Sequence, residues 1–140
     1  MSKLKLELPR KVNIKEVKSS IGKGIPGLST KTLISVKGLG EVGICSMEPR
    51  MRTVVFSGEE EDDGKSDHYY GPFHEFRYYI ICGEFTLYWG KDESKVRKGT
   101  SEKIVLKPGD ALHLTPGWKY LVKNTGVESG MFFYQMFSHK

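Results

Sequence analysis

The segment of residues 74–90 constrains the fold of this chain more than any other, because it reads as two strands separated by a glycine. Aromatic and β-branched residues fill the segment, and Gly83 interrupts it, as two strands and a tight turn require. A second segment, residues 106–124, repeats this pattern around a Pro-Gly-Asp turn and a Pro-Gly turn. Together they predict an all-β, antiparallel fold in which residues 74–90 form a hairpin.

Short apolar runs separated by turn residues continue along the chain, at residues 32–36, 41–47, 52–57, 103–106 and 131–137. Sixteen glycines and six prolines supply the turns. We expect one barrel domain over residues 31–140, built from roughly nine or ten short strands. Residues 1–30 are expected to pack on this domain or extend it. They include one helical turn within residues 14–20, which Asn13 caps.

Composition excludes several classes of function. The net charge is +5, but the lysines are scattered and form no basic helix, so we expect no nucleic-acid partner. No run of about 18 apolar residues is present, which predicts no membrane span. The first residues lack the apolar centre of a secretory signal, so a cytoplasmic location is expected.

Two polar segments are interpreted as loops. Residues 58–67 contain a run of five consecutive acidic residues, and we expect either a lid over the mouth of the barrel or a disordered excursion. Residues 91–100 are expected to form a second, polar hairpin loop. Cys45 and Cys82 show no metal-ligand spacing, so each is interpreted as a small buried apolar residue.

The turn residues of the two segments resemble the cupin superfamily of small jelly-roll barrels. The first cupin motif has two histidines, a glutamate and, further on, a glycine. When Gly83 takes the glycine position, the histidine and glutamate positions fall on Pro72, His74 and Phe76. The second motif begins with Pro-Gly-Asp, which matches residues 108–110 here.

The second motif continues with a Pro-x-Gly turn, a histidine and an asparagine. The turn fits residues 115–117, the histidine position falls on Tyr120 and the asparagine on Asn124. The resemblance therefore implies a cupin-type jelly-roll barrel over about residues 40–137, and commonly a homodimer.

The same comparison implies a degenerate metal site. A typical cupin offers three imidazoles and a carboxylate to a divalent metal, and this chain keeps only His74 of those four. A catalytic metal needs about three protein ligands, so we expect no metal cofactor. The alternative is a divalent transition metal in a rearranged site, built from His74 with Glu75, His68 or His113.

A ligand site in the barrel is predicted instead. His74 and Tyr120 are the candidate catalytic residues, because the resemblance directs both into the cavity and imidazole serves as a base near pH 7. The alternative for both is an ordinary core residue with a satisfied hydrogen bond. The candidate ligand-binding residues are mostly aromatic, and core filling is the alternative for them: Phe76, Tyr78, His113, Trp118 and Tyr134.

The function expected from this reasoning is the binding of a small organic ligand, carboxylated molecules included, without the usual metal. The protein would be a sensor or auxiliary protein, or a metal-independent acid–base enzyme. The alternatives are a metal-dependent dioxygenase, decarboxylase or isomerase, and an interaction protein with a filled barrel. Tyr79 and Ile81 share the outward face of their strand, so they are candidate dimer contacts unless the N-terminal segment covers them.

Overall fold

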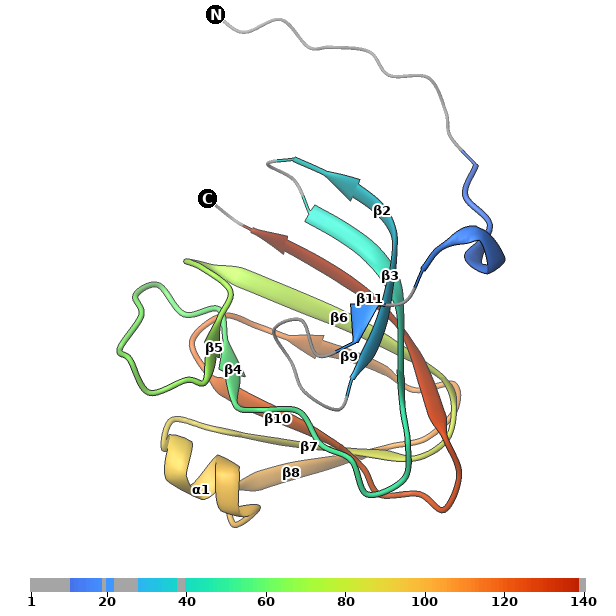
Figure 1. Ribbon diagram of the computed structural model, residues 1–140. Helices are drawn as coiled ribbons and strands as arrows, with labels where there is room; N and C mark the ends of the chain where they lie inside the picture. The colour runs from blue at the N-terminus through green and yellow to red at the C-terminus, as the bar shows by residue number, and fades with distance from the viewer. Residues whose placement is uncertain (1–10, 19, 22–27, 38–39, 139–140) are drawn as a thin grey trace, which may run out of the picture.

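Two β-sheets account for most of the residues that the structure describes. The computed structural model describes residues 11–18, 20–21, 28–37 and 40–138. The sheets face each other in a sandwich, with one short helix beside the smaller sheet (Figure 1). The predicted all-β, antiparallel fold is confirmed, although the expectation for residues 1–30 remains a prediction because residues 1–10, 19 and 22–27 lie outside the described part.

The larger sheet has six strands in the order β1, β2, β3, β11, β6, β9, and all of its neighbouring pairs are antiparallel. Its strands are β1 (Ser20–Ile21), β2 (Ser29–Val36), β3 (Gly40–Met47), β11 (Gly130–Ser138), β6 (His74–Cys82) and β9 (Ala111–Leu114). Tyr134 in β11 lies opposite Gly43 on one side and Tyr78 on the other. This register brings three distant parts of the sequence to one place on the sheet.

The smaller sheet has five strands in the order β5, β4, β10, β7, β8. Its strands are β5 (His68–Tyr69), β4 (Phe56–Ser57), β10 (Lys119–Asn124), β7 (Phe85–Gly90) and β8 (Glu102–Leu106). Only the short β4–β5 pair is parallel among the pairs in the described residues. From β6 onward the chain crosses repeatedly between the two sheets. The larger sheet holds β6, β9 and β11, and the smaller sheet holds β7, β8 and β10. This crossing pattern is that of a jelly roll.

The segment 74–90 forms two strands as predicted, but the predicted hairpin is wrong. β6 belongs to the larger sheet and β7 to the smaller one, so the turn at Gly83 is a corner between sheets. Gly83 has a φ of 84°, and a Cβ there would lie 2.6 Å from the Cα of Gly130. The glycine is therefore required by both backbone conformation and close packing.

Residues 91–100 also differ from the prediction. β7 and β8 do pair as a hairpin, but their connection contains α1 (Glu93–Lys98). The Asp92 side chain accepts hydrogen bonds from the first-turn N–H groups, and Gly99 ends the helix with a φ of 73°. In the N-terminal region, the helical turn is the 3-10 turn Ile14–Glu16, and Asn13 caps it as predicted.

Aromatic packing joins the two sheets in the core. Phe56 and Phe85 come from the smaller sheet and Phe132 from the larger one, and all three are almost completely buried. The rings of Phe85 and Phe132 meet edge to face with their centroids 5.3 Å apart. Such a contact fixes the relative position of the sheets.

Ion pairs hold the acidic segment between β4 and β5. Lys119 is only 2% exposed, and its Nζ lies 3.1 Å from Glu59 Oε2 and 2.7 Å from Asp63 Oδ2. Burial by itself lowers the pKa of Lys119, but the hydrogen bonds and charges of Asp63 and Glu59 outweigh it and raise the pKa. Lys119 therefore anchors both ends of the acidic run.

The two cysteines are free, and they occupy different environments. Cys45 is buried, as predicted. Cys82, at the end of β6, is exposed, so the prediction of a buried residue is wrong there. Among the described residues, no second layer covers the outward face of β6. Tyr79 is therefore 50% exposed and Ile81 43% exposed.

Candidate functional site

A cavity of about 330 Å³ lies on the inner face of the larger sheet. Residues of β2, β3, β6 and β11 form its floor, and the segment 68–70 closes it on the side of the smaller sheet. Its lining is Leu28, Thr30, Thr32, Glu41, Cys45, His68, Tyr70, Phe76, Tyr78, Tyr134 and Met136. The volume and the mainly aromatic wall are typical of sites for small organic molecules.

Strand alternation positions the aromatic wall. Every second residue of β6 faces the interior, which brings Phe76 and Tyr78 into the cavity, and the same rule brings Tyr134 and Met136 from β11. Gly43 of β3 makes room for Tyr134, because a Cβ at Gly43 would lie 2.9 Å from the Tyr134 hydroxyl and 2.3 Å from a backbone oxygen. A side chain at position 43 would therefore displace the Tyr134 ring.

A polar cluster of three side chains stands at the wall of the cavity. The Tyr134 hydroxyl donates a 2.6 Å hydrogen bond to Glu41 Oε2, and the Thr32 hydroxyl donates to the same oxygen at 3.2 Å. The two hydroxyl oxygens are 3.1 Å apart. The pKa of Tyr134 is raised, mainly by burial and then by Glu41, so it stays a protonated donor at neutral pH.

The ionisable groups nearby are held neutral by burial. Desolvation raises the pKa of the Cys45 thiol to about 12 and raises the pKa values of Tyr70 and Tyr78 as well. Burial also lowers the pKa of His68, which leaves its imidazole neutral at pH 7. Glu41 is consequently the charged side chain of the described cavity lining.

Three of the predicted ligand-binding residues, Phe76, Tyr78 and Tyr134, line this cavity together. His74 lies beside it, with the ring of Tyr70 6.5 Å away, and its buried Nδ1 has no hydrogen-bond partner among the described residues. Tyr120 lies in the core, where its hydroxyl donates to the backbone oxygen of Thr115. Burial raises the pKa of Tyr120 to about 12.

The other two predicted ligand-binding residues lie outside the cavity. Trp118 meets Trp89 edge to face, and Lys91 Nζ lies 4.7 Å from the centre of its ring. His113 is on the outer face of β9, with Nε2 3.1 Å from Oε1 of the buried Glu75. Arg77 Nη2 lies 3.0 Å from the same oxygen, so these side chains form an outward-facing cluster.

Sequence reasoning missed the residues that give the cavity its polarity, Glu41, Thr32 and Tyr70. In the predicted strand 41–47, the apolar residues Val42 and Ile44 share one face. The structure turns the opposite face, with Glu41 and Cys45, into the cavity. The pairing of Tyr134 with Gly43 could have indicated this cavity wall, because a large ring opposite a glycine marks a site of close approach. That signal needs the strand register, which the sequence does not contain.

The residues present do not fit the transition-metal site that the cupin resemblance implies. Of the four aligned positions, Pro72, Phe76 and Tyr120 offer no suitable ligand, and Tyr120 is already bonded to Thr115. Within the described residues, no group of three or more His, Cys, Asp or Glu side chains is arranged to hold a metal ion.

In the same residues, no helix combines the length and hydropathy needed to cross a membrane.

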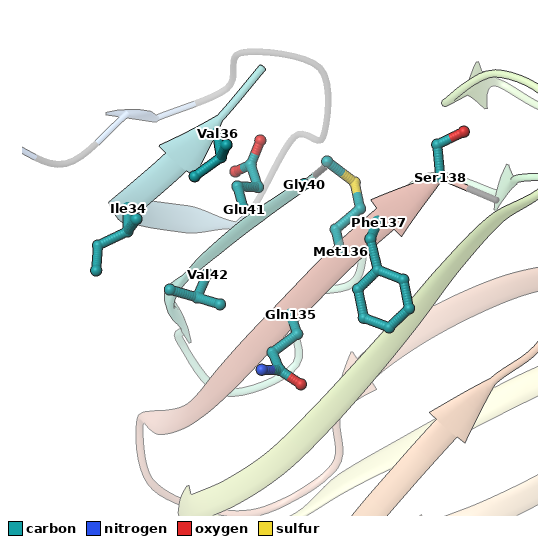
Figure 2. Close-up of a pocket in the computed structure, with 9 residues that line it drawn as sticks. All are labelled: Ile34, Val36, Gly40, Glu41, Val42, Gln135, Met136, Phe137 and Ser138. Carbon is teal, nitrogen blue, oxygen red and sulfur yellow. The ribbon is translucent and has the colours of Figure 1, made fainter. Parts of the chain in front are cut away.

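A second hollow, of about 410 Å³, lies mainly on the outer face of the larger sheet, and Glu41 and Met136 line both this hollow and the inner cavity. Figure 2 shows Ile34 and Val36 of β2 on one side, Gln135 and Phe137 of β11 on the other, and Val42 of β3 between them. Its lining is mainly apolar. At its edge, the centre of the Phe137 ring lies 4.8 Å from the guanidinium carbon of Arg77 in β6.

The sequence matches no protein-family model, and no curated protein is similar to it. Solved structures do match its fold. A predicted oxalate decarboxylase from Thermotoga maritima superimposes with a TM-score of 0.66 at 15% identity, over 92% of this chain and 99% of that one. The polyketide cyclase RemF from Streptomyces resistomycificus gives 0.66 and 15%, over 93% and 80%.

The cupin domain of Schizosaccharomyces pombe Cnp3 gives a TM-score of 0.65 at 13% identity, over 90% of this chain and 72% of that one. Likeness at this identity concerns the fold. It confirms the predicted cupin-type jelly roll. Two of these structures are named as enzymes and the third as a domain.

Proposed function

From the cupin fold and the geometry of its interior, we propose that this protein binds a small organic molecule in the cavity of the larger sheet. The observation that carries the proposal is the combination of an aromatic wall with one converging polar cluster, Glu41, Tyr134 and Thr32. Small-molecule sites have this composition, with apolar walls for burial and a few fixed polar groups for orientation.

The proposal covers two roles, a sensor or auxiliary protein and a metal-independent acid–base enzyme. A fold does not determine which of them applies. For the enzymatic role, Glu41 is a group in the cavity that can accept a proton, while Tyr134 orients it. His74 and Tyr120 remain the alternative pair, which the experiment below compares directly.

The test is a fragment screen followed by two double variants. Fragments that raise the melting temperature are mapped by backbone amide shifts, and we expect shifts on β2, β3 and β11. The variant Glu41→Gln with Tyr134→Phe should abolish the stabilisation by these fragments. The matched variant His74→Gln with Tyr120→Phe should retain it. The reverse pattern would transfer the site to His74 and Tyr120, and fragments that shift none of the cavity amides would refute the proposal.

The metal-dependent alternative requires ligands that the described residues do not bring together. Elemental analysis of protein purified without an affinity tag separates it from the proposal, because near-stoichiometric iron, manganese, nickel or zinc would restore it. The third alternative, an interaction protein with a solid interior, requires a cavity too small for any ligand. The volume of about 330 Å³ favours ligand binding over this alternative.

We also propose a homodimer through the outer face of the larger sheet. Tyr79 and Ile81 are half-exposed there, and the apolar hollow of Figure 2 lies on the same face of the sheet. Apolar side chains exposed on one face of a sheet are typical of a contact with another molecule. A second copy is the occupant proposed, because a face built of continuous strands can pack on itself about a two-fold axis.

A further inference from the structure

We infer that the molecule bound in the cavity carries a positively charged amino or ammonium group, which Glu41 and the surrounding aromatic rings bind. This inference names the ligand class for the site proposed above, and therefore rests on that proposal. It is built from three observations: the charge of the lining, the way in which Glu41 is fixed, and the nature of the walls.

The first observation is the sign of the charge. Among the described residues that line the cavity there is one carboxylate, Glu41, and neither lysine nor arginine. His68, the remaining basic side chain in the lining, is kept neutral by burial. A carboxylated ligand would meet Glu41 without a compensating cation, whereas an ammonium group would supply the missing opposite charge.

The second observation is that Glu41 is already oriented. Tyr134 and Thr32 both donate to Oε2, while no hydrogen bond or ion pair is present at Oε1 in the described part of the chain. Both partners are neutral hydroxyls, so neither compensates the carboxylate, and one acceptor oxygen stays available. An oxygen held in place before binding loses less conformational entropy when a ligand arrives.

The third observation is the wall. Tyr70, Phe76, Tyr78 and Tyr134 surround the space beside Glu41. The faces of aromatic rings carry partial negative charge and attract ammonium groups, most strongly where water is excluded. Rings together with one carboxylate form the usual environment for alkylated amines, because the rings contact the carbon atoms while the carboxylate balances the charge.

The test uses probes that share one ring and a similar size and carry a cationic, a neutral or an anionic polar group. Phenethylamine, 2-phenylethanol and phenylacetate form one set, and the corresponding naphthyl compounds form a second set of larger size. Isothermal titration and ligand-observed NMR measure their affinities for the full chain. We expect the amine of at least one set to bind about tenfold or more tightly than its alcohol, and the carboxylate to bind weakest.

Two variants then locate the charge effect. Glu41→Gln keeps the acceptor for Tyr134 but removes the charge, and should reduce amine affinity about tenfold while changing alcohol affinity little. Glu128→Gln removes the same charge at an exposed position outside the cavity lining, and should leave all affinities unchanged. Equal losses in both variants would show a general charge effect and overturn the inference.

The outcomes separate this inference from the proposed function. Preferential binding of alcohols or carboxylates, with amide shifts at the cavity, would overturn the ammonium inference and leave ligand binding in place. A failure of both probe sets to bind anywhere on the inner face of the larger sheet would count against both.

Discussion

The Tyr134 hydroxyl donates a 2.6 Å hydrogen bond to the carboxylate of Glu41, across 93 residues of sequence. Glu41 is the second residue of β3 and Tyr134 lies in the middle of β11, and the register of these two neighbouring strands brings them together. This pair supplies the only charged group of the described cavity lining together with its positioning donor. The behaviour of the cavity therefore depends on it.

Removal of the Tyr134 hydroxyl tests this pair. Tyr134→Phe should lower the free energy of unfolding by about 1–2 kcal/mol, because a hydrogen bond to a charged group is lost while the ring remains. Urea denaturation measures the change. Tyr88→Phe, whose hydroxyl makes no hydrogen bond among the described residues, serves as the control and should change the value by less than about 0.5 kcal/mol. An equal effect of both substitutions would contradict the role of the hydrogen bond.

Replacement of Lys119 should release the acidic segment. Lys119→Met leaves Glu59 and Asp63 without their cation, and we expect a loss of about 1–3 kcal/mol. This is less than for a fully buried pair, because the Asp63 side chain is 40% exposed. Faster proteolysis within residues 58–67 should accompany it. Lys107→Met, at a side chain that is 69% exposed, is the control and should change neither quantity.

The stability of the protein should depend on the protonation of His68. Burial lowers its pKa in the folded chain, so the unfolded chain binds this proton more readily. The free energy of unfolding should therefore fall as the pH drops below about 6.5, the pKa of an unperturbed histidine. His68→Gln should remove this part of the loss, whereas His113→Gln should not. Parallel pH profiles of His68→Gln and the unmodified protein would refute the assignment.

The two thiols should differ in reactivity. Cys82 is exposed, whereas burial raises the pKa of Cys45 to about 12 and leaves it protonated. A thiol reagent near pH 8 should modify Cys82 in the folded protein, and both cysteines only in urea. Cys82→Ser should abolish the native reaction and Cys45→Ser should leave it unchanged. Rapid modification of Cys45 in folded protein would show that the cavity opens to solvent.

The proposed dimer can be tested at the outer face of the larger sheet. The combined substitutions Tyr79→Lys and Ile81→Lys place two charges in the proposed contact, and light scattering after size exclusion should show a shift from dimer to monomer. Val105→Lys adds a charge at an apolar side chain of β8 that is 51% exposed, and should leave the dimer intact. A dimer that persists in the double variant would place the contact elsewhere.

Local sequence patterns predicted the strands well and some of the connections poorly. The strands of residues 74–82 and 85–90 follow from their aromatic and β-branched content, but their assignment to different sheets does not. A glycine turn between two strands has the same local pattern in a hairpin and in a corner. The helix in residues 93–98 was missed although Asp92 and Gly99 are ordinary cap residues, because the segment is short and highly polar.

The sequence by itself determined that this chain forms a jelly roll and that Phe76, Tyr78 and Tyr134 face its interior. The strands and turns follow from short-range rules, since glycine and proline define turns and side chains alternate along a strand. The jelly roll and the inward direction of these side chains were what the resemblance to cupins implied. Only the tertiary structure decided which polar groups share the cavity. Glu41, Thr32 and Tyr134 meet through the register of β2, β3 and β11, and this register depends on packing between residues that are far apart in the chain.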